Sequence, residues 1–133
     1  MTPTGRAAQQ YLQNHVRSRT PVELVVMLYD GAVRTVGAAA DAAARRDIRT
    51  RRDNVSKALG ILAELQASLD EEQGGQIARD LDELYAWMTS RLVDATIRQE
   101  AKPLHEVRKV LEILRDGWQQ VASQPAPAAA ATP

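Results

Sequence analysis

Apolar residues recur along most of this chain at spacings of three and four, which is the period of an α-helix with one buried face. Four stretches carry this pattern, and their predicted ranges are about 21–44, 47–68, 76–98 and 103–122. No stretch alternates apolar and polar residues with a period of two, so no β-strand is predicted. The pattern therefore predicts an all-α protein.

The first predicted helix has a clear start and an unusually wide apolar face. Thr20 is a good N-cap, Pro21 suits the first helical position, and Glu23 is placed to complete a capping box. One apolar stripe consists of Val22, Val25, Tyr29, Ala32, Val33 and Val36. Leu24 and Leu28 lie to one side of it. A face this wide indicates either a helix buried among several others or a surface held ready for a partner.

The other three helices each show a narrower seam. In the second helix the seam is Val55, Ala58, Leu62, Leu65 and Leu69, and Leu59 and Ile61 lie beside it. In the third it is Ile77, Leu81, Leu84, Tyr85, Met88, Leu92 and Ala95. In the fourth it is Leu104, Val107, Leu111, Leu114, Trp118 and Val121, with Val110 and Ile113 off the seam. Seams of this kind favour helix–helix packing.

Short connections between long helices predict an antiparallel up-down-up-down four-helix bundle. The run DEEQGG at 70–75 is expected to be a turn, and Pro103 to open the last helix. We expect one bundle domain over residues 11–122, between a disordered N-terminus (1–10) and a disordered Pro/Ala-rich tail (123–133). Residues 11–16 are a short helical or extended segment, which is either a frayed extension or a cap that docks on the bundle.

Composition narrows the function classes further. Seventeen basic and seventeen acidic residues cancel, so no nucleic-acid footprint shows in the net charge. There is no cysteine, which excludes disulfides and thiol catalysis. No apolar run is long enough for a membrane span, and the N-terminus lacks a signal-peptide core. We expect a cytoplasmic protein that does not insert into membranes.

Charge and glycine placement each leave two interpretations open. Basic residues gather at one end of the predicted bundle, namely Arg45, Arg46, Arg49, Arg51, Arg52, Arg98 and Lys102. Asp70, Glu71 and Glu72 lie at the other end. A solvated surface explains this separation, and the alternative is a landing site for an acidic partner.

Four glycines fall inside predicted helices, where glycine is unfavourable. They indicate either close helix packing or a groove for another chain, and they are Gly31, Gly37, Gly60 and Gly117.

No arrangement of residues points to catalysis. There is no HExxH motif, no P-loop, no GxGxxG motif and no Glu-x-x-His pair, so no catalytic, metal or cofactor residue is predicted and we expect that the protein is not an enzyme. His105 supports an alternative of another class, a histidine phosphotransfer bundle. The expected basic residue, Arg108, is present, but the glycine that should follow it is Lys109. A structural bundle without any client is a third possibility.

Several separate motifs resemble the FliS family of flagellar secretion chaperones. They are YLQNHV at 11–16, TPVELVVMLYDGAVR at 20–34, SLDEEQGGQIARDLDELYAWMTSRLVDATIRQE at 68–100 and VLEILRDGWQQ at 110–120. The resemblance covers about residues 11–122. Two positions depart from the family pattern, because Trp87 replaces the usual tyrosine and Gly117 the usual alanine.

The resemblance implies an antiparallel helical bundle that acts as a cytosolic export chaperone. By this resemblance it would bind the disordered C-terminal segment of flagellin, prevent premature polymerisation and deliver flagellin to the flagellar type III export gate. The candidate partner-binding residues are those of the N-terminal segment and those off the helix seams. They are Tyr11, Leu12, Val16, Leu24, Leu28, Leu59, Ile61, Val110 and Ile113. The resemblance also implies that residues 11–16 act as a movable cap.

Overall fold

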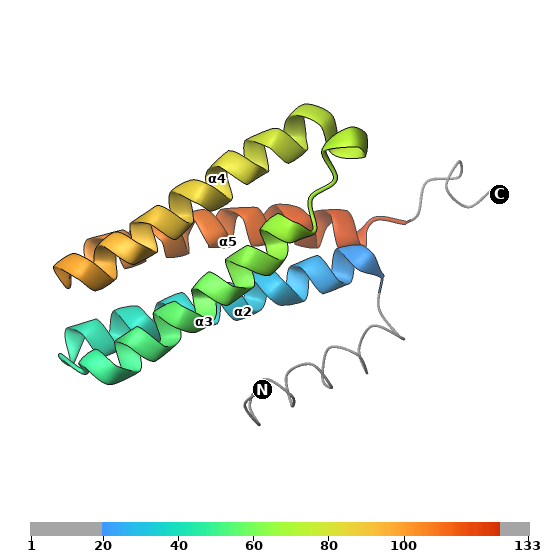
Figure 1. Ribbon diagram of the computed structural model, residues 1–133. Helices are drawn as coiled ribbons and strands as arrows, with labels where there is room; N and C mark the ends of the chain where they lie inside the picture. Colours follow the sequence, from blue (N-terminus) through green and yellow to red (C-terminus); the bar gives the residue numbers. More distant parts are fainter. Residues whose placement is uncertain (1–19, 126–133) are drawn as a thin grey trace, which may run out of the picture.

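The computed structural model describes residues 20–125, and these form four α-helices without a strand. In chain order the helices are α2 (Pro21–Ala44), α3 (Ile48–Ala67), α4 (Glu71–Arg98) and α5 (Lys102–Ser123). The predicted all-α bundle is confirmed for this part of the chain (Figure 1). The predictions for residues 1–10 and for the segment 11–16, and most of those for the tail, lie outside the described residues.

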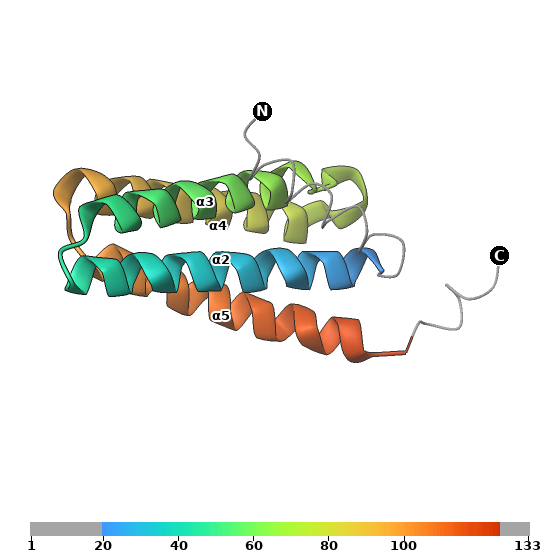
Figure 2. The same ribbon diagram turned by 90° about the horizontal axis from the view of Figure 1, so that it is seen from below.

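The four helices alternate in direction and surround a common core. α2 packs against α3 and α5, and α4 packs against the same two neighbours from the other side, so α2 and α4 are diagonally opposed. The α2–α3 and α4–α5 connections share one end, and the α3–α4 connection lies at the other (Figures 1 and 2). We call these the basic end and the open end, respectively.

Side-chain caps set the helix starts. The Thr20 hydroxyl accepts the Glu23 backbone N–H at 3.2 Å and donates to the Glu23 carboxylate at 3.1 Å. Asp47 caps α3 by accepting the Thr50 N–H, and Asp70 caps α4 in the same manner. These bonds satisfy backbone donors that the first helical turn leaves without partners, which is why short polar residues stand at these positions.

The start of α4 differs from the predicted turn. Residues 71–74 already form a helical turn, and the break comes at Gly75, whose φ of 55° and ψ of −128° lie outside the helical region. A residue without Cβ adopts this conformation at little cost. The glycine therefore joins a short first turn to the regular helix that follows it.

The core is aliphatic, with two tyrosines at its centre. Most seam residues predicted to be buried are almost inaccessible to solvent. They are Tyr29, Ala32, Val36, Val55, Ala58, Leu62, Leu65, Tyr85, Met88, Leu92, Ala95, Leu104, Val107 and Leu111. Small residues let the helices approach closely, since a Cβ placed on Gly31 would lie 3.2 Å from Cδ1 of Ile61 on α3. Close packing thus explains this glycine.

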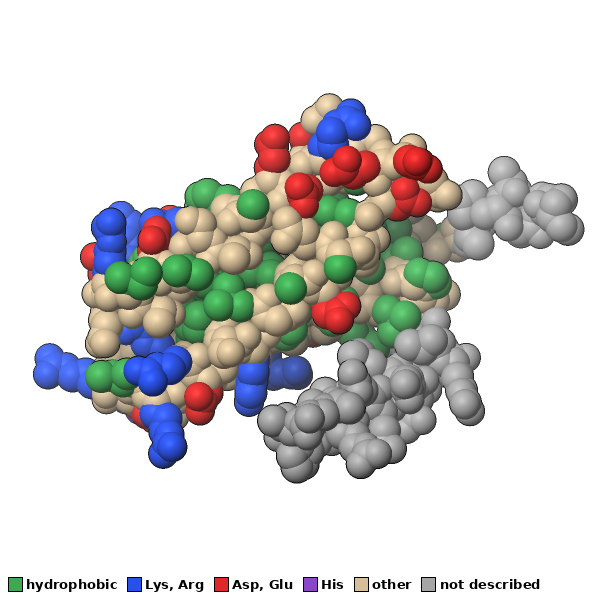
Figure 3. Space-filling model, viewed as in Figure 1, with side chains coloured by type: hydrophobic (Ala, Val, Ile, Leu, Met, Phe, Trp, Pro, Cys, Tyr) green, Lys and Arg blue, Asp and Glu red, His purple; other side chains and the backbone are tan. Residues whose placement is uncertain are grey.

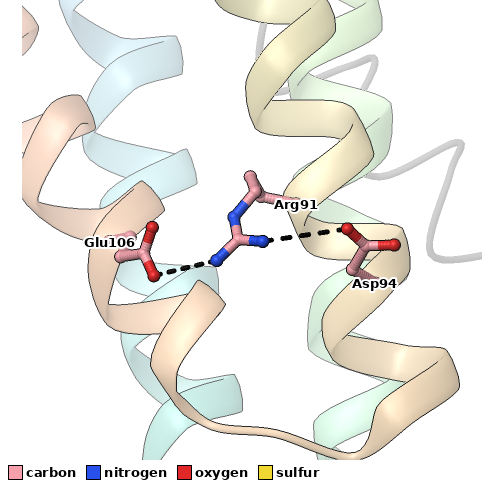
Figure 4. Close-up of polar contacts among 3 residues, drawn as sticks. All are labelled: Arg91, Asp94 and Glu106. Carbon is pink, nitrogen blue, oxygen red and sulfur yellow. Dashed lines mark hydrogen bonds and ion pairs between the residues drawn. The ribbon is translucent and has the colours of Figure 1, made fainter.

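An ion pair also ties α4 to α5. The guanidinium of Arg91 lies between Glu106 of α5, 2.8 Å away, and Asp94 one turn along its own helix, 3.8 Å away (Figure 4). Because all three side chains are partly exposed, such pairs contribute a few tenths of a kcal/mol to about 1 kcal/mol. They orient the two helices more than they stabilise them.

Candidate partner-binding site

Burial of the helix seams falls from the basic end to the open end. Leu92, Ala95 and Leu104, near the basic end, are fully buried, whereas Ile77 is 71% exposed and Val121 is 46% exposed. The sequence pattern placed both of these in buried seams, and for both that prediction is wrong. The cause is geometric, because α4 diverges from α2 toward its own N-terminus (Figure 1).

An apolar cavity of about 240 Å³ opens where the helices diverge. All four helices and the α3–α4 connection line it, with the residues Val25, Leu65, Ser68, Leu69, Asp70, Gly74, Ile77, Ala78, Leu81, Tyr85 and Trp118. We call it the open-end cavity. Hydrophobic side chains also follow the furrow between α3 and α4 (Figure 3). The cavity is large enough to receive bulky aliphatic or aromatic side chains.

Tyrosine hydroxyls form a polar contact beside this cavity. The Tyr29 and Tyr85 hydroxyl oxygens lie 2.5 Å apart and are buried. Burial raises the pKa of Tyr29, and hydrogen bonds with Tyr85 and Trp118 oppose that rise. Burial also raises the pKa of Tyr85, and its contact with Tyr29 raises it further. Both phenols therefore stay neutral at physiological pH and serve as hydrogen-bonding groups.

A strip on α5 extends the apolar surface at the open end. Ile113 is 63% exposed, and Gly117 and Val121 follow at successive spacings of four, so the three lie along one helix face. A Cβ added at Gly117 would meet no atom within 4 Å. The side of α5 that bears Glu106 faces α4, and this strip lies close to that side. We call the open-end cavity together with Ile113, Gly117 and Val121 the open-end surface.

The structure distributes the partner-binding residues proposed from sequence over several faces. Leu28, Leu59, Ile61 and Val110 are partly buried and pack against the core, and Leu24 is half-buried. Ile61 lies beside Gly31 at the α2–α3 contact. Of the six described candidates, Ile113 alone is highly exposed, and none of the six lines the open-end cavity. Tyr11, Leu12 and Val16 lie outside the described residues.

Sequence reasoning missed most of the cavity-lining residues because it assigned them to seams. Leu65, Leu69, Ile77 and Trp118 match the helical period as well as any core residue. The period shows which face of a helix is apolar, but not whether the helix's own neighbours cover that face along its whole length. The Gly74–Gly75 pair ahead of Ile77 is the signal in the sequence, since the break at Gly75 separates the first turn of α4 from the regular helix that follows.

The site offers apolar contact and a few hydrogen-bonding groups. Among residues 20–125, no group of three or more histidine or acidic side chains is placed to hold a metal ion. His105 is exposed in the first turn of α5, where its backbone N–H donates to Ala101 at 3.2 Å. No helix in the described part of the chain is long and apolar enough to cross a membrane.

Comparisons with known proteins agree on one family. The model of the family described as "Flagellar protein FliS" matches residues 4–125. The flagellar secretion chaperone FliS of Salmonella typhimurium is 35% identical over 116 residues, covering 86% of each chain. The Bacillus subtilis protein of that name is 34% identical over 110 residues, covering 83% of this chain and 81% of its own.

A solved structure supports the fold independently. The crystal structure of a bacterial flagellar chaperone superimposes with a TM-score of 0.72 and covers 90% of this chain and 97% of its own. Its sequence identity is 20%, so it bears on the fold alone. The family match spans nearly the whole chain and rests on several relatives, and the chain therefore belongs to the FliS family of flagellar secretion chaperones.

Proposed function

We propose that this protein binds the C-terminal segment of flagellin in the cytoplasm, keeps it from polymerising and delivers it to the flagellar export gate. One observation carries the proposal. The seams of α4 and α5 continue to Ile77 and Val121, yet no helix of the described chain covers these side chains, which stay 71% and 46% exposed. A segment that becomes helical on binding would complete the bundle there, as in helix-in-groove recognition.

The energetics suit a chaperone that must release its client. Burying the apolar part of the open-end surface favours binding by about 25 cal/mol for each Å² removed from water. Ordering a disordered segment opposes binding by about 2–5 kcal/mol. The balance gives a complex that holds the segment and can still hand it over. Membership in the FliS family supports flagellin as the client, since the relatives are named flagellar secretion chaperones.

Two isoleucines on one helix give a matched test. Ile77 at the open end is 71% exposed, and Ile97 near the basic end is 74% exposed. Replacing either by serine removes similar exposed apolar area, because both side chains are mainly exposed. In a titration with a labelled flagellin C-terminal peptide, Ile77→Ser should weaken binding roughly tenfold, whereas Ile97→Ser should leave it unchanged.

Other results would contradict the proposal. If the wild-type chain does not bind the peptide, or does not slow flagellin polymerisation, the bundle is not a flagellin chaperone. If both serine variants bind the peptide as the wild type does, the client lies elsewhere on the molecule. A Val121→Ser variant extends the test to α5 and should behave like Ile77→Ser.

A further inference from the structure

The basic end carries unpaired positive charge. Lys and Arg side chains lie at this end of the molecule (Figure 3). The basic residues in or near the α2–α3 and α4–α5 connections are Arg45, Arg46, Arg49, Arg51, Arg52, Arg98 and Lys102. Within residues 20–125, none of the seven lies within 4.0 Å of a carboxylate oxygen, in contrast to Arg91, Arg108 and Arg115, which all form ion pairs. The chain as a whole is neutral, and Asp41, Asp47, Asp53 and Glu100 also lie near these two connections, so the seven basic residues give this end a modest excess of positive charge.

A cavity of about 330 Å³ lies among these residues. Its lining consists of Ala43, Arg46, Asp47, Ile48, Arg51 and Gln99. Arg51 is only 7% exposed, and its Nη2 donates to the backbone oxygens of Ala95 and, at 3.3 Å, of Glu100. Its Nε is buried and has no hydrogen-bond partner in the described structure. Arg51 thus binds backbone carbonyl groups at the C-terminal end of α4 and places a buried positive charge in the cavity wall.

The backbone at the rim of this cavity is unusual. The Arg46 N–H donates to Ala43 and the Asp47 N–H to Ala42, which is a Schellman ending for α2. Arg46 occupies the left-handed position of that motif with a φ of 58°, where glycine is the favoured residue. Gln99, on the other connection, is also left-handed with a φ of 54°. The chain therefore keeps two long polar side chains at this rim at a cost in stability, which is a reason to look for function.

We propose that the basic end is a second docking surface, which binds an acidic segment of a partner protein. Carboxylates of the partner would lie at the cavity beside Arg46 and on the adjoining surface beside Arg52, since the N–H groups of an arginine donate to a carboxylate in a bidentate manner. Ile48 and Ile97, 49% and 74% exposed, would receive aliphatic side chains of the same segment. The flanking isoleucines favour a mixed acidic and apolar peptide over a nucleic acid or a lipid surface. Asp47 in the cavity lining repels anions, and a peptide that spaces its carboxylates between apolar residues meets less of that repulsion than a polyanion does.

Arg46→Gly gives a test in which stability and binding should change in opposite directions. The probe is a fluorescein-labelled peptide of alternating glutamate and leucine, titrated into the full chain at low salt. Because Arg46 supplies a charge-assisted contact, Arg46→Gly should weaken binding roughly tenfold. The same change relieves the left-handed strain, so the melting temperature should not fall. Arg52→Gln should also weaken binding, and Arg34→Gln, which removes an exposed charge from the middle of α2, should not.

Several outcomes would overturn the proposal. They are equal binding of a peptide with glutamine in place of glutamate, unchanged affinity in both basic-end variants, and tighter binding of single-stranded DNA or phosphatidylglycerol vesicles than of the acidic peptide. The basic end is separate from the open-end surface, so Arg46→Gly should leave the affinity for the flagellin peptide unchanged. Each proposal can therefore fail without the other.

Discussion

The hydroxyl groups of Tyr29 on α2 and Tyr85 on α4 meet in the core with their oxygens 2.5 Å apart. These two helices are diagonally opposed, and they make few other direct contacts. The pair lies where the bundle begins to open, because Tyr85 also lines the open-end cavity. A buried polar contact between otherwise separate helices fixes how α2 and α4 stand relative to each other, and with them the width of the cavity.

A double-mutant cycle measures this contact. Tyr29→Phe leaves the Tyr85 hydroxyl buried without its partner and should lower the free energy of unfolding by about 1–3 kcal/mol. Tyr85→Phe leaves the Tyr29 hydroxyl without this partner and should likewise lower the free energy of unfolding by about 1–3 kcal/mol. The double variant should lose less than the sum of the two, since it strands no hydroxyl. Urea unfolding of the four proteins gives the coupling, and strictly additive losses would show that the two hydroxyls do not interact.

The tyrosine pair also predicts sensitivity to alkaline pH. Both pKa values are raised in the folded state, so the unfolded chain loses these protons first. Stability from the pair is therefore complete below about pH 10, the ordinary tyrosine pKa, and is lost as pH rises above it. The free energy of unfolding should decline more steeply between pH 10 and pH 11 in the wild type than in the double phenylalanine variant. Equal slopes would mean that the pair does not titrate differently in the two states.

The helices were predictable from sequence because each signal for them is local. Thr20, Pro21 and the three-and-four spacing of seams such as Val55–Leu62 depend on neighbours within a turn or two. The open-end cavity was not predictable, because it depends on where α4 diverges from α2. Ile77 and Leu92 occupy equivalent places in one repeating pattern, yet one is 71% exposed and the other fully buried. The spacing of apolar residues along the sequence does not show where α4 moves away from α2.

Glycines inside the helices give a second way to locate a partner. A Cβ added at Gly60 or at Gly117 would meet no atom within 4 Å, so neither glycine is needed for packing within the bundle. Replacing either by alanine should raise the free energy of unfolding by up to about 1 kcal/mol through helix propensity. Gly117 lies between Ile113 and Val121 on the open-end surface, so Gly117→Ala should also weaken flagellin-peptide binding. Gly60→Ala is the matched control and should stabilise the fold without changing peptide affinity. If Gly60→Ala weakens binding and Gly117→Ala does not, the client binds α3 instead.

The last prediction concerns the segment 11–16, which precedes α2. α2 begins at Pro21 next to the open-end cavity, which Val25 lines one turn later. Val16 is four residues before Thr20 and Tyr11 nine, so an extended chain reaches roughly 13 Å and roughly 30 Å from Thr20. Tyr11, Leu12 and Val16 are apolar enough to cover the open-end surface, and their tether gives them a high effective concentration there. We therefore expect that this segment competes with the client.

Deleting residues 1–17 tests the competition. Without a tethered competitor, the truncated chain should bind the flagellin C-terminal peptide more tightly or faster than the full chain. It should also self-associate more, because an uncovered apolar surface of this kind promotes association. Thr20 remains in the truncated chain, so the cap of α2 is intact and a loss of stability is not expected. Amide exchange at residues 11–16 of the full chain should become faster when the peptide binds, since the client displaces them. Slower exchange at residues 11–16 together with weaker binding by the truncated chain would contradict the competition and make the segment part of the client contact.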